Sequence, residues 1–162
     1  MDKMSEEQET GFTLIELLIV IAIIGILAAI AIPNLLAAVQ RGRQKRTMAD
    51  MRTLATAIES YAVDYDAYPS ATCSGYTATG TALTDTSFAS LTPSYIANPP
   101  KKDGWGHALF YSRGPGGSAY NIRSYGKDGT ASTLVCGTTH DFNDDILYSN
   151  GTFLQWPEGA QH

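Results

Sequence analysis

The sequence predicts an α+β protein in which one long N-terminal helix, half apolar and half amphipathic, packs against a small antiparallel sheet of three or four strands. Three observations predict this fold. An almost wholly apolar run extends from Gly11 to Leu36. Helical periodicity continues after it to about Asp66, and short runs of aromatic and β-branched residues follow in the C-terminal third. The 162 residues have room for one domain of ordinary size.

The first half of the predicted helix is long and apolar enough to span a membrane. No residue from Leu17 to Gln40 is charged, and about 20 apolar residues cross a bilayer as a helix. A secretory signal peptide has a shorter apolar stretch after a basic segment, whereas the first ten residues here, MDKMSEEQET, are acidic. Gly25 and Pro33 are predicted to break or weaken the helix, because Gly lowers helix propensity and Pro removes a backbone donor. A simple kinked anchor is the alternative interpretation.

Glu16 is the one carboxylate in the apolar run, and two interpretations of it stay open. Thr13 and Glu16 have the spacing of a capping box, in which each side chain accepts a hydrogen bond from a free backbone N–H at the helix start. Alternatively, a carboxylate at membrane depth is costly unless a positive group pairs with it. Removal of the residues before Phe12 would create such a group, an amine beside Glu16 or beside the Glu16 of a neighbouring copy.

The second half of the predicted helix is amphipathic. Apolar residues recur at three- and four-residue spacing after Val39, which is the period of one helix face. They are Met48, Met51, Leu54, Ala55, Ile58, Tyr61, Ala62 and Tyr65. The helix is expected to end before Tyr68, because Pro69 disfavours a helical conformation for the residue preceding it. The rest of the chain must cover this apolar stripe.

Four short runs are predicted as strands. They read HALFYS, AYNIRSY, DILYSN and GTFLQW. The glycine-rich segment Gly114 to Ser118 predicts the turn between the first two, and Gly151 after Asn150 predicts the turn before the last. The segment from Ser70 to Pro100 is rich in Thr, Ser, Ala and Gly, so we expect it at the surface, with a short helical or turn element around SFASLTPSYI.

Charge and motifs exclude several functions. A net charge of -5 and a pI near 5.0 argue against nucleic-acid binding. The one basic cluster, Arg41 to Arg46, directly follows the apolar run, so we interpret it as a membrane-interface anchor rather than a phosphate-binding patch. The sequence contains no nucleophile elbow, Walker loop or H-E-x-x-H motif, so no enzymatic activity is expected. His107 and His140 are isolated, which disfavours a transition-metal site.

The two cysteines, Cys73 and Cys136, both follow the apolar run. They lack the spacing of a zinc site, so a disulfide is the favoured prediction, and it requires an oxidising compartment. Closing a loop of about 60 residues stabilises a fold by about 4 kcal/mol on the chain-entropy model. Two buried free thiols in a cytosolic protein are the alternative.

The stretch GFTLIELLIVIAIIGILAAIAIP resembles the processing site and hydrophobic helix of type IV pilins and type II secretion pseudopilins. The resemblance implies that a prepilin peptidase cleaves between Gly11 and Phe12 on the cytoplasmic side and methylates the new amine. It also implies that Glu16 pairs with the Phe12 amine of an adjacent subunit during assembly. Three segments follow: a leader, residues 1–11, a transmembrane and polymerisation helix, residues 12–40, and a periplasmic head, residues 41–162.

The segments PPKKDGWGHALFY, YNIRSYGKDG and NDDI are similar to the C-terminal half of the major pseudopilin of type II secretion. The chain departs from that family at Gly104, where Pro is common, and in an insertion that contains Cys136. These departures leave a pilus pilin open as an alternative. The resemblance implies a structural calcium, and the matching positions are Asp128, Asn143, Asp144 and Asp145. A solvated acidic loop is the other interpretation of these residues.

The resemblance thus implies a structural subunit of a type II secretion pseudopilus. Its expected partners are further copies of itself, the prepilin peptidase, an inner-membrane assembly platform, minor pilins or pseudopilins, and membrane lipid before assembly. The expected location is the bacterial inner membrane, single pass with the head in the periplasm, and then a filament. The positive-inside rule alone would place the head in the cytoplasm. The alternatives are a type IV pilin for adhesion, motility or DNA uptake, and a membrane-tethered periplasmic metal-binding or sensing module.

Overall fold

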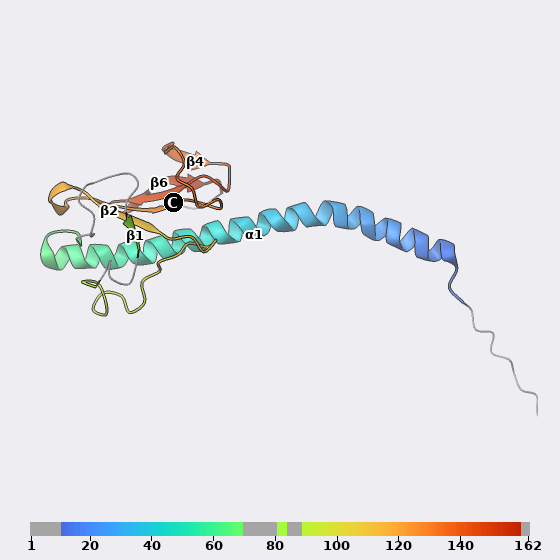
Figure 1. Cartoon of the computed structure of the whole chain (residues 1–162), viewed down its shortest axis with the longest axis horizontal. Coiled ribbons are helices and arrows are strands. Elements are labelled where there is room, and N and C mark those ends of the chain that lie inside the picture. Colours follow the sequence, from blue (N-terminus) through green and yellow to red (C-terminus); the bar gives the residue numbers. More distant parts are fainter. Residues whose placement is uncertain (1–10, 70–80, 84–88, 160–162) are drawn as a thin grey trace, which may run out of the picture. The chain divides into compact units, whose positions relative to one another are not determined.

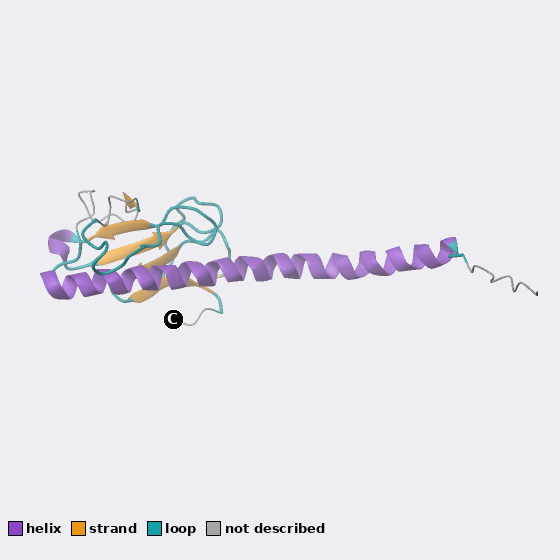
Figure 2. Ribbon diagram, turned by 90° about the horizontal axis from the view of Figure 1, so that it is seen from below, coloured by secondary structure: helices purple, strands orange, loops and turns teal. Residues whose placement is uncertain are grey.

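The structure is a computed structural model, and it describes residues 11–69, 81–83 and 89–159. The chain divides into two units, and the boundary falls between Val39 and Gln40. One helix, α1, extends from Leu14 to Tyr65, and its second half belongs to the unit that contains the head. Figures 1 and 2 show the strands of the head lying along this second half of α1.

Residues next to each end of α1 explain where the helix begins and where it ends. Thr13 precedes the first helical residue and forms a capping box with Glu16. After Tyr65 the chain leaves the helix through Asp66, whose φ of 52° lies in the left-handed region, and Pro69 follows shortly. The predicted helix, from Phe12 to about Asp66, is therefore confirmed to within two residues at each end.

The described residues of the head form one mixed sheet with the strand order β1-β2-β3-β5-β6-β4. Its strands are β1 Thr81–Ala82, β2 Phe110–Arg113, β3 Tyr120–Ser124, β4 Gly137–Thr139, β5 Ile146–Ser149 and β6 Thr152–Pro157. Neighbouring strands are antiparallel except for β4 and β6, which are parallel.

Both predicted turns are confirmed. A short 3-10 helix, Pro115–Gly117, joins β2 to β3, and its central Gly116 has a φ of 69°. The β5–β6 hairpin turns at Asn150 and Gly151, with φ values of 45° and 89°. Two consecutive positive φ values are those of the tight hairpin turn that Asn-Gly favours.

The core lies between the amphipathic half of α1 and the sheet. From the helix it takes Met48, Met51, Leu54, Ala55 and Ile58, and from the sheet side Leu109, Tyr111, Tyr120, Ile122, Ile146 and Phe153. The predicted stripe is therefore confirmed as far as Ile58. Tyr61 is only partly buried against the core, and Tyr65 is 62% exposed.

The sheet has two more strands than the upper number expected from the sequence. The extra strands, β1 and β4, have two and three residues and lie at the two edges of the sheet. Their sequences are Thr-Ala and Gly-Thr-Thr, which are too short to show any alternation of apolar and polar residues. The expected element around SFASLTPSYI is a turn in its described part, residues 89–95.

Candidate functional site

The start of α1 presents the predicted assembly residues. The backbone N and the Oγ1 of Thr13 donate to Oε2 of Glu16, at 2.9 and 2.7 Å, and the backbone N of Glu16 donates to Oγ1 of Thr13 at 3.3 Å. The capping-box interpretation of Glu16 is confirmed. Phe12 is 80% exposed and lies one residue before the cap. An amine released at Phe12 would therefore be close in sequence to the carboxylate.

The side chains of the apolar segment, residues 11–39, are almost all exposed in this structure. No residue from Gly11 to Val39 is buried, although most of them are Ile, Leu, Val or Ala. The helix is long and apolar enough to cross a membrane. The predicted break at Gly25 and Pro33 is not seen in this structure, because α1 is continuous across both residues. A single proline removes one backbone donor, and the helix continues on both sides of it. Exposed apolar area of this extent requires lipid or other apolar helices as its surroundings.

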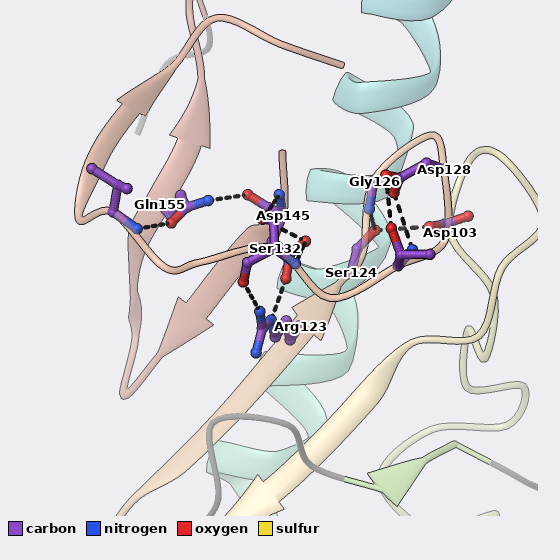
Figure 3. A network of polar contacts seen from close by, with 10 residues as sticks. Asp103, Arg123, Ser124, Gly126, Asp128, Ser132, Asp145 and Gln155 are labelled. Atoms are coloured by element: carbon purple, nitrogen blue, oxygen red, sulfur yellow. Dashed lines mark hydrogen bonds and ion pairs between the residues drawn. The ribbon is translucent and has the colours of Figure 1, made fainter. Parts of the chain in front are cut away.

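The predicted calcium ligands lie in two groups in the head, as Figure 3 shows for Asp128 and Asp145. Asp128 accepts hydrogen bonds from the backbone N and Oγ1 of Thr130, at 3.0 and 2.7 Å, and these bonds lower the pKa of Asp128. Asp145 is fully buried and forms an ion pair with Arg123. Among the residues that the structure describes, no group of three or more His, Cys, Asp or Glu side chains has the arrangement of a metal site.

The remaining predicted ligands bond within their own loop. Asp144 accepts from the backbone N of Asp141 at 3.3 Å, and the backbone N of Asn143 donates to Asp141 at 3.0 Å. In this structure the carboxylates of Asp128, Asp144 and Asp145 each accept hydrogen bonds from protein donors. Calcium binding stays a prediction that only a binding measurement can test.

Known families match both halves of the chain. The type II secretion system protein G family matches residues 34–143, and the prokaryotic N-terminal methylation motif matches residues 8–32. This chain belongs to the type II secretion protein G family. The protein G family consists of structural pseudopilins.

The individual relatives include core protein G chains and a type IV pilin. The type II secretion system core protein G of Vibrio cholerae serotype O1 is 33% identical over 123 residues, which cover 75% of this chain and 83% of that protein. The core protein G of Escherichia coli K12 is 29% identical over 78% of this chain and 88% of that protein. The type IV major pilin protein PilA of Myxococcus xanthus is 52% identical over 58 residues, which are 36% of this chain and 26% of the pilin.

This protein G chain has Gly104 where proline is common in the family, and the structure gives a reason for the glycine. The backbone N of Gly104 donates to Oγ1 of Thr47 on α1 at 2.9 Å, and a Cβ at Gly104 would overlap the carbonyl oxygen of Arg43. Proline would lack this donor and carry the clashing carbon. The Asp-Gly-Trp-Gly loop therefore approaches α1 more closely than Asp-Pro-Trp-Gly can in this arrangement.

Neighbouring residues fix the same loop to the helix and the sheet. Oδ1 of Asp103 accepts from the backbone N of Trp105 and of His107, both at 2.9 Å, and Oδ2 accepts from Oγ of Ser124 at 2.8 Å. The indole Nε1 of Trp105 donates to Oε1 of Gln40 at 2.6 Å. The buried Asp103 thus shapes the loop and joins it to the end of β3.

The cysteine and histidine predictions have separate outcomes. Cys136 is exposed next to β4, and Cys73 lies outside the described residues, so the disulfide stays a prediction. His107 contacts the carbonyl oxygen of Lys127 at 3.2 Å, and His140 lies 2.9 Å from Oε2 of Glu158. The two histidines bond to different partners, in keeping with their isolation in the sequence.

Sequence reasoning missed the role of Arg123. This residue was covered by the strand prediction, but its guanidinium is buried with Asp145, Ser132 and Gln155 nearby (Figure 3). An arginine is almost never fully buried unless it is paired, so its place in a predicted strand between Ile122 and Ser124 did not by itself indicate burial.

Proposed function

We propose that this protein G chain is a non-catalytic structural subunit of a type II secretion pseudopilus. Residues 12–40 hold it in the bacterial inner membrane before assembly, with the head in the periplasm. A prepilin peptidase cleaves between Gly11 and Phe12, and the released chain joins a helical filament. The observation that carries this proposal is a capped, outward-facing apolar helix that begins directly after a Gly-Phe pair and lies within a methylation motif.

In this proposal Glu16 has two roles that are compatible. The cap uses Oε2, and an ionised carboxylate has about four acceptor positions on its two oxygens. The carboxylate can therefore keep its cap and also accept from the Phe12 amine of an adjacent subunit. A carboxylate left unpaired among apolar helices is costly, so this pairing would favour one register between subunits.

Helix packing supplies the attraction between subunits. The apolar side chains of residues 12–39 exchange lipid contacts for contacts with other helices when a subunit leaves the bilayer. We expect the assembly platform of the inner membrane and minor pseudopilins to start and order this process. Methylation of the Phe12 amine keeps its positive charge and so preserves the partner of Glu16.

A pair of substitutions tests the pairing. Glu16→Gln keeps a side-chain oxygen for the cap and removes the charge, whereas Thr13→Ala removes the cap hydroxyl and keeps the charge. We expect Glu16→Gln to insert into the membrane normally and to yield few filaments. Thr13→Ala should weaken the helix start by about 1 kcal/mol and still yield filaments. Filament yield is measured by electron microscopy of sheared cells. Wild-type filament yield from Glu16→Gln would refute the pairing.

A type IV pilin is the second candidate function, and the 52% identity with the Myxococcus xanthus major pilin over 58 residues favours it. The two candidates differ in what deletion of the gene abolishes. Loss of a secreted protein from the medium supports a pseudopilin, and loss of surface pili with secretion intact supports a pilin. A membrane-tethered metal-binding module would need neither cleavage at Phe12 nor filaments.

A further inference from the structure

We propose that the guanidinium of Arg123 serves as a built-in cation for the buried carboxylate of Asp145, so that the head folds without a divalent cation at this position. The segment concerned is residues 125–145, which connects β3 to β5. We call it the connecting segment. The proposal concerns the fold of the head and does not depend on the filament proposal.

Arg123 lies in β3, and its side chain is 6% exposed, while the side chain of Asp145, just before β5, is 0% exposed. The Nε of Arg123 donates to Oδ2 of Asp145, and its Nη2 donates to the carbonyl oxygen of Ser132 at 2.6 Å. The guanidinium of Arg123 therefore bonds to Ser132 in the middle of the connecting segment and to Asp145 at its end, as Figure 3 shows.

The other polar atoms of Asp145 are also engaged. Its Oδ1 accepts from the backbone N and the Oγ of Ser132, at 3.1 and 3.0 Å. Its carbonyl oxygen accepts from Nε2 of Gln155 at 2.9 Å, and Oε1 of Gln155 accepts from the backbone N of Val135 at 2.7 Å. Both carboxylate oxygens have donors, so the network is satisfied without a further cation.

This arrangement competes with a calcium ion on two grounds. Calcium requires six to eight oxygen ligands at about 2.3–2.6 Å, so Asp145 would have to give up its donors from Arg123 and Ser132. A divalent cation at Asp145 would also meet the positive charge of Arg123, which is buried and therefore poorly screened by solvent. The ring of Tyr125 faces the guanidinium, with its centroid 5.1 Å from Cζ, and adds a cation–π contact.

The geometry of the guanidinium explains why arginine suits this position. Its rigid fork sends donors toward Asp145 and toward Ser132 in fixed directions, and it retains its charge when buried. Burial raises the pKa of Asp145, and the hydrogen bonds from Ser132 together with the charge of Arg123 act in the opposite direction. Without Arg123 the carboxylate would be a buried charge lacking compensation.

The test compares melting temperatures of the full-length chain in detergent micelles, with either EDTA or calcium chloride in excess. The wild-type melting temperature should be the same in both buffers within about 2 °C, the shift expected of a negligible free-energy change. Arg123→Gln should lower it by roughly 10 °C or more, because it leaves Asp145 buried without its cation. The control Arg46→Gln removes an arginine that is exposed and lies 3.6 Å from Asp50, and it should have little effect.

The double variant Arg123→Gln with Asp145→Asn distinguishes pairing from mere packing. If the two charges compensate each other, the double variant should lose much less than the sum of the single losses. Strict additivity would overturn the proposal. So would a wild-type melting temperature that falls in EDTA and returns with calcium.

Isothermal titration calorimetry of the wild type with calcium chloride covers the case in which Arg123→Gln does not fold. The proposal expects no saturable binding that depends on Asp145. Saturable binding in the wild type that disappears in Asp145→Asn would overturn it. Weak heat that persists in Asp145→Asn would come from the exposed acids of the connecting segment and would leave the proposal supported.

Discussion

Gly104 controls how closely the loop before β2 can approach α1. Its backbone N–H reaches the buried Oγ1 of Thr47, which itself donates to the carbonyl oxygen of Arg43 at 2.9 Å. Since a Cβ at Gly104 would meet backbone atoms of Arg43, no side-chain movement could relieve the clash. A departure from the family pattern, visible in the sequence only as a missing proline, is thus a packing requirement of this chain.

Substitution of Gly104 should therefore be costly. We expect Gly104→Ala to lower the free energy of unfolding by about 2 kcal/mol through steric overlap, and Gly104→Pro to cost more because the bond to Thr47 is also lost. Chemical denaturation of the full-length chain measures both. Gly42→Ala is the matched control: Gly42 lies in α1 with open space around it, so alanine should stabilise the helix by about 0.5–1 kcal/mol. Equal effects at the two glycines would contradict the explanation.

The spacing of apolar and β-branched residues predicted the long helix and the four longer strands, and it missed the two shortest strands. The helix could be predicted because its apolar spacing and its caps agree, and β2, β3, β5 and β6 because each is rich in aromatic or β-branched residues. The strands β1 and β4 could not, because pairing with a neighbour, not their own sequence, makes them strands. The Arg123–Asp145 pair joins residues 22 positions apart, and no local pattern indicates such a pair.

A side-chain hydrogen bond ties the last turns of α1 to the turn at residues 89–95. Oη of Tyr95 donates to Oδ2 of Asp64 at 2.6 Å, and the ring of Tyr95 packs edge-on against Tyr61. This bond to Asp64 is the main cause that raises the pKa of Tyr95 to about 12. The bond is lost when the phenol ionises, so the contact between these two elements depends on pH in the alkaline range.

The expected consequence is a fall in stability as the pH rises from about 10 toward 12. In this range the tyrosine of the unfolded chain has lost its proton while folded Tyr95 keeps it, so the unfolded state binds fewer protons and gains stability with pH. Tyr95→Phe should flatten this decline. Burial also raises the pKa of Tyr111 and Tyr120, so part of the slope should persist. Denaturation midpoints at a series of pH values measure the effect, and an unchanged slope in Tyr95→Phe would argue against the bond to Asp64.

The two units of the chain, the apolar segment up to Val39 and the head from Gln40 onward, differ in how their apolar side chains are covered. The apolar unit has no buried residue among those described, so its surroundings in the cell must come from lipid or from other subunits. The head has its own core, and buried polar groups such as Tyr120 and Asp103 form hydrogen bonds within the head. The sequence alone could predict this division, because the apolar run, the cleavage motif and the amphipathic stripe are all contiguous patterns. It could not predict how the head satisfies its buried charges, since that depends on contacts between distant segments.

The most direct test of cleavage and assembly is mass spectrometry of the N-terminus of the protein in an isolated filament fraction. We predict a chain that begins at Phe12 with a methylated amine, because in the proposed function assembly requires the positive group that cleavage creates for Glu16. A filament fraction composed of chains that retain residues 1–11 would contradict it.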